Sequence, residues 1–197
     1  MSQENAEEAG RGVRIPLAGA ETSRTLDERI LVRFPALGRK LLAAWARLPR
    51  HSRLRRAMLA RSVRRGYAAL NRRDFDLLAI SLDPGIVYHP RADEPDPSPH
   101  VGRDAWERLS NGFADSFSEV TYEVLELIDA GDYVIISTVL HAVPRGQGSA
   151  SAAGVSDTYV FVNKQRDGLV VEGWEYKTKQ EAFEALGLSE QDAHADS

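Results

Sequence analysis

GVSDTYVFVNKQRDGLVVEGWEY, residues 154–176, contains two runs of β-branched and aromatic residues on either side of an RDG turn. This pattern predicts a β-hairpin with strands at 155–163 and 169–177. An earlier stretch, FDLLAISLDPGIVYHP at residues 75–90, predicts a short helix stopped by a Pro-Gly pair and then a short strand that ends at His89. Together the two stretches indicate a helix-then-sheet unit that closes around a pocket.

The composition is that of a globular domain with a sizeable core, since 43% of the 197 residues are hydrophobic and 27% are charged. Cysteine is absent, which rules out disulfides and thiolate chemistry. No apolar run reaches the roughly 18 residues of a membrane span. The first 25 residues lack the apolar core of a signal peptide, and we therefore expect a cytoplasmic protein. The five histidines lack ligand spacing, so we expect no metal or other cofactor.

Outside the two opening stretches, the hydrophobic period indicates where the remaining elements lie. Ser52 is a plausible N-cap for a helix that runs to about Asn71, and Asp74 can cap a short helix through Leu82. A further helix is expected from about residue 102, a hairpin from strands 119–128 and 132–143, and a last helix near the C-terminus. Helices grouped first and antiparallel strands grouped later predict an α+β fold, with a curved antiparallel sheet that bends around the N-terminal helices.

The expected domain organisation is a single domain at 52–188 preceded by a helical extension at 26–50. Residues 1–25 and 189–197 are rich in small and polar residues, and we expect them to be disordered. Pro35 fits the first turn of a second helix within the extension.

Charge divides the chain into two parts of opposite sign. Residues 24–73 contain fifteen Arg or Lys but only Asp27 and Glu28, a net charge of +13, whereas residues 74–197 have a net charge of −15. We expect the basic amphipathic extension to lie against the acidic domain as a collar over the pocket entrance, with three apolar side chains supplying buried area, Leu37, Leu41 and Trp45. The alternatives are a solvated helix face, contact with nucleic acid, or attachment to an anionic membrane.

Four segments taken in order resemble a known superfamily. They are GYAALNRRDFDLLAISLDPGIVYHP, VGRDAWERL, IDAGDYVIIS and DGLVVEGWEYKTKQEAFEALGL, and the resemblance covers roughly residues 52–188. This part of the chain is similar to the SnoaL-like branch of the nuclear transport factor 2-like superfamily. The resemblance implies a conical one-domain α+β fold with an apolar pocket, often in homodimers. Because the superfamily includes isomerases, cyclases, dehydratases and members without chemistry, the activity has to be argued from individual residues.

Comparison with the ketosteroid isomerases of that superfamily aligns two positions of this chain with catalytic groups. Their aspartate base precedes a proline at the end of the first strand, where this chain has His89. Their neutral aspartate, which donates a hydrogen bond to the oxyanion, corresponds to Asp157 in VSDTYVF. The first-helix tyrosine corresponds to Gly66, with Tyr67 one position away.

The chemistry of these residue types leads to the candidate site. An imidazole such as that of His89 titrates near neutrality and can serve as a general acid or base. Asp157 shares strand parity with Tyr159, so it should point into the cavity opposite His89, and burial without a cation would keep it neutral. We expect further ligand contacts from seven side chains, mostly aromatic: Tyr67, Trp106, Phe113, His141, Tyr159, Trp174 and Glu175. A purely structural role is the alternative for each of these residues.

Two functions follow from these patterns. In the first, a pocket binds a small, mostly apolar metabolite, and His89 and Asp157 supply acid–base chemistry of the isomerase, cyclase or dehydratase kind. In the second, the domain is a non-catalytic ligand-binding or dimerisation module whose basic helices contact a protein, nucleic acid or an anionic membrane. A homodimer is expected in both cases.

Overall fold

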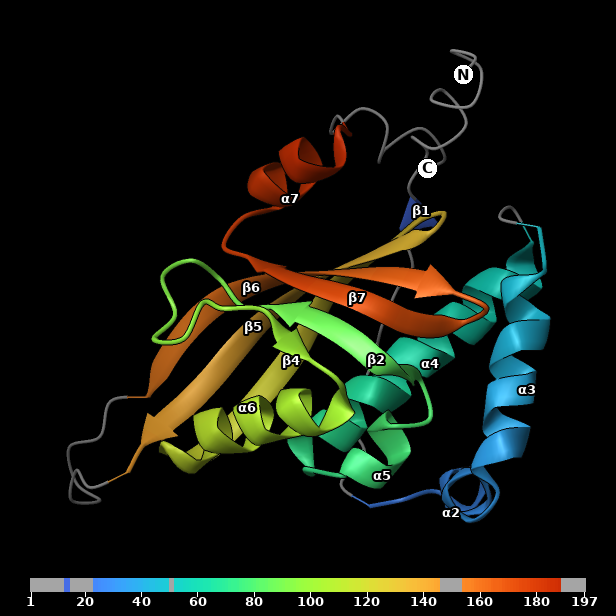
Figure 1. Cartoon of the computed structure of the whole chain (residues 1–197), viewed down its shortest axis with the longest axis horizontal. Coiled ribbons are helices and arrows are strands. Elements are labelled where there is room, and N and C mark those ends of the chain that lie inside the picture. Colours follow the sequence, from blue (N-terminus) through green and yellow to red (C-terminus); the bar gives the residue numbers. More distant parts are fainter. Residues whose placement is uncertain (1–12, 15–22, 50–51, 146–153, 189–197) are drawn as a thin grey trace.

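The computed structural model describes residues 13–14, 23–49, 52–145 and 154–188 (Figure 1). The two tails expected to be disordered lie largely outside these ranges. The described residues form an α+β fold in which helices flank one curved sheet, as the sequence predicted. None of the described helices is both long and apolar enough to cross a membrane.

The helices begin where the sequence places capping residues. Ser52 and Asp74 cap the helices that begin at Arg53 and Phe75, through side-chain hydrogen bonds to the backbone. Pro35 occupies the first turn of the helix that it begins. These predictions are confirmed. The fourth helix is shorter than predicted, because it ends at Leu78 and the chain continues into a strand from Leu82. The helices are α2 (Leu26–Arg33), α3 (Pro35–Ala46), α4 (Arg53–Asn71), α5 (Phe75–Leu78), α6 (Arg103–Asp115) and α7 (Lys179–Leu186).

The described strands form one seven-stranded sheet in the order β1-β4-β5-β6-β7-β2-β3. Both predicted hairpins are confirmed, with turns at 131–132 and 167–168. The sheet is antiparallel except between β2 and β7, which run parallel because β2 enters the sheet from the helical part of the chain. The strands are β1 (Val13–Arg14), β2 (Leu82–His89), β3 (His100–Val101), β4 (Phe117–Ala130), β5 (Tyr133–Pro144), β6 (Val155–Arg166) and β7 (Leu169–Tyr176).

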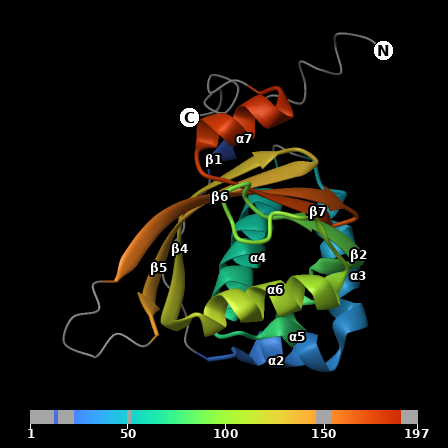
Figure 2. The ribbon, with the colours of Figure 1, turned by 60° about the vertical axis from the view of Figure 1, so that its left-hand side comes forward.

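The sheet curves over α4 and α6, and α7 lies on its other side (Figure 2). Two apolar clusters correspond to these two faces. On the concave face, Leu59 and Val63 of α4 pack with Leu127 and Ile136 of the sheet. On the convex face, Phe183 of α7 packs against a second set of strand residues. The helices therefore do not all lie on one side, since α7 covers the outer face.

A buried ion pair joins α4 to the sheet. Arg55 Nε donates to Asp129 Oδ2 over 2.9 Å, and the two side chains are only 8% and 2% exposed. Arg55 also donates to the carbonyl oxygens of Ala46 and Gly131, while the amide of Gly131 donates to Asp129 Oδ1. Because nearly every polar atom of the pair has a partner, both charges are tolerated away from water.

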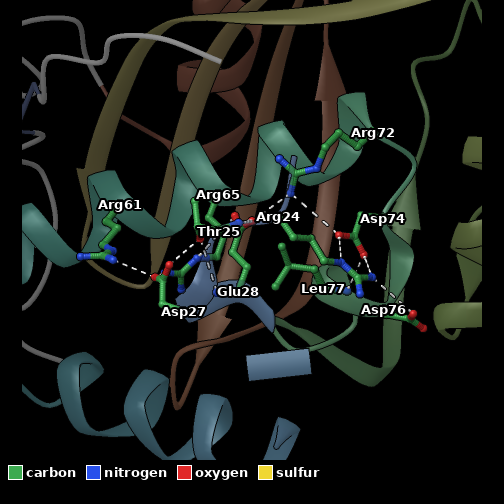
Figure 3. Close-up of polar contacts among 10 residues, drawn as sticks. All are labelled: Arg24, Thr25, Asp27, Glu28, Arg61, Arg65, Arg72, Asp74, Asp76 and Leu77. Atoms are coloured by element: carbon green, nitrogen blue, oxygen red, sulfur yellow. Dashed lines mark hydrogen bonds and ion pairs between the residues drawn. The ribbon is translucent and has the colours of Figure 1, made fainter. Parts of the chain in front are cut away.

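A different set of ion pairs joins α2 to α4 and α5 (Figure 3). Asp27 accepts from Arg61 and Arg65, and Glu28 accepts from Arg72 over 3.1 Å. The only two acidic residues of the basic segment are thus bound by arginines of that same segment. The contact expected between the basic segment and the acidic domain consists mainly of separate ion pairs, such as that of Arg55 with Asp129.

The packing of α3 differs from the expected collar. Trp45 is buried in the core, but Leu37 and Leu41 are exposed. The helix approaches the sheet at the β6–β7 turn, where Gly168 has φ +77° and an added Cβ would lie 2.5 Å from the Leu42 carbonyl oxygen. Only one side of α3 therefore contacts the domain, and none of the described residues covers Leu37 and Leu41 fully.

Removing one partner of the buried pair should be strongly destabilising. Asp129→Asn leaves the Arg55 charge without a counter-charge, and we expect a loss of about 3–5 kcal/mol in the free energy of unfolding. Asp115→Asn is the matched control, because the Arg73–Asp115 pair is largely exposed and should contribute about 0–1 kcal/mol. Urea denaturation measures both variants, and equal losses would contradict the assigned role of Arg55.

The contact between Arg24 and Asp74 should make stability depend on pH. The hydrogen bond from Arg24 holds the pKa of Asp74 below its usual value, so the stabilisation is complete above the unfolded pKa of about 3.9 and disappears as pH falls through the folded pKa. The stability difference between the wild type and Asp74→Asn should therefore be largest near neutral pH and shrink in acid. Asp76→Asn, at an exposed position, is the control. A difference for Asp74→Asn that stays constant in urea titrations from neutral to acid pH would refute this.

Candidate active site

A cavity of about 980 Å³ lies between the concave face of the sheet and helices α4, α5 and α6. Its size is typical of sites that bind small organic molecules. Aromatic side chains form much of its wall, with Tyr67 from α4 and Tyr122, Tyr159 and Phe161 from the sheet. Their ring centroids are 5.9–6.3 Å apart, mostly in edge-to-face geometry. Such a wall suits a flat apolar ligand.

Helix α6 forms the opposite side of the cavity and packs only partly against the rest of the domain. Trp106, Leu109 and Phe113, spaced three and four residues apart, line the cavity along one side of the helix. No residue of α6 is buried, although this side is apolar. An apolar side of a helix normally faces a filled core. Here it faces a space that a ligand can occupy.

The most buried acidic group of the cavity is Glu175, on β7. Tyr88 of β2 donates its hydroxyl hydrogen to Glu175 Oε1, and the amide of Arg91 donates to Oε2 over 3.3 Å. Burial raises the pKa of Glu175 above its usual value, although these two hydrogen bonds oppose the effect. A raised pKa makes the carboxylate a stronger base, which favours a role in proton transfer.

The backbone of β7 gives Tyr88 room to reach Glu175. Tyr88 pairs across the parallel strands with Gly173, and a Cβ at that glycine would lie 3.0 Å from Cδ2 of the Tyr88 ring. Glycine therefore allows the ring to lie close over the strand, with its hydroxyl directed to the residue two positions further along.

A second carboxylate lies at the loop that follows β2. Tyr159 donates to Glu94 Oε1 over 2.9 Å, and Arg91 Nη2 lies 3.4 Å from the same oxygen. The Arg91 guanidinium lies 4.0 Å from the centroid of the Tyr159 ring, in cation–π geometry. Glu94, Tyr159 and Glu175 all line the cavity, and both of these carboxylates are hydrogen-bonded to phenols.

Burial also raises the pKa of the phenols around the cavity. The effect is large for Tyr67 and Tyr88, and the pKa values of Tyr122 and Tyr159 also lie well above their ordinary value. All four phenols therefore keep their protons at neutral pH. They can donate hydrogen bonds to a ligand oxygen.

Five of the nine residues expected from the sequence line the cavity: Tyr67, Trp106, Phe113, Tyr159 and Glu175. Trp174 lies on the convex face, where it packs with Tyr133. His141 is exposed on β5, with Nδ1 3.0 Å from Ser156 Oγ. Trp174 and His141 are each next to a strand residue that points inward, so their own side chains point to the other face of the sheet.

His89 lies on the convex face as well. Its ring stacks on Trp174 with centroids 5.4 Å apart, and its Nε2 lies 3.1 Å from Glu172 Oε1. The expectation that it looks across the cavity is therefore not met. Strand alternation explains the difference, because Ile86 and Tyr88 of β2 point inward and the next residue must point outward.

Asp157 has the inward parity of Tyr159 but lies near the end of β6, where the sheet extends beyond the cavity. Its side chain is 36% exposed, and its Oδ2 lies 2.9 Å from Arg91 Nη2. The expected burial without a cation is thus not found, because Arg91 is its partner. Asp157 and His89 do not face each other.

Sequence reasoning missed Tyr88, Glu94 and Arg91. Tyr88 could have been found by applying to IVYHP the same alternation that was applied to β6, since Ile86 marks the inward face. Glu94 and Arg91 lie in a proline-rich loop without a period, so no local signal places them. Within the described ranges, no group of three His, Asp or Glu side chains is arranged to hold a metal ion.

Residues 63–173 match the model of the SnoaL-like domain, which is more than half of the chain. The chain belongs to the SnoaL-like family. No curated protein matches it.

Solved structures share the SnoaL-like fold at low sequence identity. Bal32a, from a soil-derived mobile gene cassette, is 23% identical and has a TM-score of 0.53, with 64% of this chain and 93% of Bal32a covered. A protein from Catenulispora acidiphila with a ketosteroid isomerase-like fold, in complex with trimethylamine, is 15% identical with a TM-score of 0.51, covering 66% and 95%. TerC, co-crystallised with polyporic acid, is 15% identical with a TM-score of 0.50, covering 64% and 95%. At these identities the likeness shows the fold alone.

Replacing Tyr88 by phenylalanine should raise the pKa of Glu175 further. The Tyr88 hydroxyl stabilises the carboxylate form by donating a hydrogen bond to it, and Tyr88→Phe removes that bond while the ring stays buried. A carbon-13 NMR titration of the Glu175 carboxyl group measures the change. Tyr133→Phe on the convex face should leave this pKa unchanged, and an unchanged or lower pKa in Tyr88→Phe would contradict the assignment.

Proposed function

We propose that this SnoaL-like protein binds a small, mostly apolar molecule that carries a carbonyl group, and that Glu175 moves a proton to and from it. The observation that carries the proposal is the buried Glu175–Tyr88 pair at the wall of an aromatic cavity. Active sites often contain acidic groups that are removed from water beside a cavity. Burial there shifts the pKa of the group toward the value that proton transfer needs. Glu175 takes the role that the sequence suggested for His89.

Binding is supported by the apolar character of the cavity. The aromatic wall and the apolar side of α6 are covered only in part, so a ligand between them would remove apolar surface from water. The structural relatives that hold trimethylamine and polyporic acid bind small molecules on the same fold. They support small-molecule binding here without indicating which molecule is bound.

The chemistry is supported by the arrangement of a base and neutral donors. The Glu175 carboxylate would take a proton from the carbon beside the carbonyl, and the electron pair of that C–H bond would move to the carbonyl oxygen. A neutral phenol, such as that of Tyr122, would stabilise the resulting enolate by a hydrogen bond. Return of the proton from Glu175 to the enolate carbon completes the exchange.

One observation favours a binding protein without catalysis as the second candidate. Both carboxylate oxygens of Glu175 already have partners, Tyr88 and the amide of Arg91. A carboxylate with these partners could order the cavity wall without taking a proton from a ligand. In that case the protein would bind the same class of ligand and leave it unchanged.

Hydrogen–deuterium exchange of 2-tetralone tests the proposal, because this planar ketone has acidic protons beside its carbonyl group. We expect the protein in D2O to accelerate exchange, and Glu175→Gln to lower the rate about 100-fold or more, the usual contribution of a general base. His89→Gln should retain the rate, since its ring lies on the other face. Proton NMR measures exchange, and tryptophan fluorescence of Trp106 reports binding.

Two results would reject the proton-transfer role. One is a rate in Glu175→Gln equal to that of the wild type. The other is saturable binding of 2-tetralone with no exchange above buffer, which would instead support the non-catalytic candidate.

A further inference from the structure

Five large apolar side chains of α2 and α3 are exposed in a regular series. They are three or four residues apart in sequence, with two on α2, Phe34 at the joint and two on α3. Single exposed apolar residues are common on proteins, but a contiguous series marks a surface that contacts something else. We call this series the apolar stripe, and it consists of Leu26, Ile30, Phe34, Leu37 and Leu41, which are 77%, 51%, 56%, 45% and 49% exposed.

The stripe is the side of the two helices that the domain does not use. Leu31 of α2 and Trp45 of α3 are buried against the rest of the protein. Figure 1 shows both helices at the edge of the molecule, outside α4 and α5. On α2 the exposed residues Leu26 and Ile30 lie on a different side from Leu31, whereas on α3 the exposed Leu37 and Leu41 continue a row whose C-terminal end, Trp45, is buried.

Basic residues accompany the stripe at a fixed offset. Arg29, Arg33 and Lys40 follow Leu26, Ile30 and Leu37 by three residues each, which places each cation beside its apolar neighbour on the helix surface. All three are exposed, and within the described ranges none of them is paired with a carboxylate. Arg33 lies 5.7 Å from the ring centroid of Phe34, over the stripe itself.

The acidic residues of this segment do not offset these charges. Asp27 and Glu28 are bound by Arg61, Arg65 and Arg72 on α4, on the inner side of α2. Hydrogen bonds from Thr25 and then Arg61, with the charge of Arg65, lower the pKa of Asp27 to about 2. Both acids are held by arginines on the inner side of α2, so among the described residues they do not offset the charges of Arg29, Arg33 and Lys40.

We propose that the apolar stripe and its basic neighbours dock α2 and α3 on an anionic lipid surface. Amphipathic helices with leucine and phenylalanine on one side and arginine or lysine beside them insert their apolar side chains at the headgroup boundary, while the cations contact lipid phosphates. The charge of the surface selects this occupant over a second copy of the chain. A symmetric contact of two stripes would bring the same cations of both copies together.

The docking surface lies outside the cavity and needs neither a ligand nor proton transfer. The proposed lipid contact can therefore be correct or wrong independently of the function proposed for Glu175.

Flotation of the full-length protein with vesicles tests the proposal. We expect binding to phosphatidylglycerol vesicles, weak binding to phosphatidylcholine vesicles, and loss of binding at high salt. The variant Leu37→Ser/Leu41→Ser should lower the partition coefficient about tenfold or more, because it removes two inserted apolar groups. It should fold normally, since both side chains are exposed.

Matched controls distinguish binding by the apolar stripe from nonspecific hydrophobic or electrostatic binding. Leu125→Ser removes a leucine that is 57% exposed on β4 and should leave vesicle binding unchanged. Arg29→Glu/Lys40→Glu should abolish binding, whereas Arg166→Glu, exposed at the end of β6, should reduce it little.

Three results would overturn the proposal. The first is binding to phosphatidylcholine equal to that to phosphatidylglycerol, and the second is equal loss in the Leu125 control. The third is a dimeric wild type that becomes monomeric in Leu37→Ser/Leu41→Ser without binding either vesicle, which would assign the stripe to a second copy. Circular dichroism and thermal unfolding confirm that each variant is folded before it is compared.

Discussion

The ion pair between Arg55 and Asp129 fixes the position of α4, and most of the remaining structure depends on that helix. Two charges removed from water are tolerated here because the carbonyls of Ala46 and Gly131 and the amide of Gly131 complete their hydrogen bonding. The pair therefore specifies one orientation of α4 over the end of the β4–β5 hairpin. From that position α4 presents an apolar side to the sheet and a row of arginines to α2.

The cavity follows from how the two layers meet. Helix α4 packs against the sheet at one end, whereas α6 touches its rim without a single buried residue. The space left between them is lined by aromatic rings, several of which carry a hydroxyl group. Burial then shifts these groups in the same direction, because it raises the pKa of the phenols and also that of Glu175. One desolvated environment thus produces a set of neutral donors around one titratable acid.

The two sides of the N-terminal helices differ in their contacts. Ion pairs hold the inner side of α2, whereas apolar and basic residues are exposed on the outer side. The carboxylates of α2 are on its inner side, where they are held by arginines of α4 (Figure 3). The arginines of the segment therefore have two separate places, in ion pairs on the inner side of α2 and exposed beside apolar residues on the outer side. Net charge summed along the chain does not distinguish these places, because it ignores which side each residue occupies.

Much of the fold could be inferred from local patterns. Proline and capping residues mark the starts of the helices, and the RDG and AGD turns mark the two hairpins. The aromatic wall was also partly predictable, since strand alternation correctly groups Tyr159 with Phe161. The same alternation in the short strand before His89 turns Ile86 and Tyr88 inward and the imidazole outward, so the predicted position of His89 at the cavity is wrong.

Local chemistry thus determined the elements, their order and the family, since each depends on residues close together in sequence. The partners of the acidic groups were decided by long-range contacts. Arg91 reaches Asp157 across 66 positions, and Tyr88 meets Glu175 only because β2 joins the sheet parallel to β7 at a glycine. No short-range period encodes the register of two strands separated by most of a domain, so the site that these contacts form could be recognised only in the folded chain.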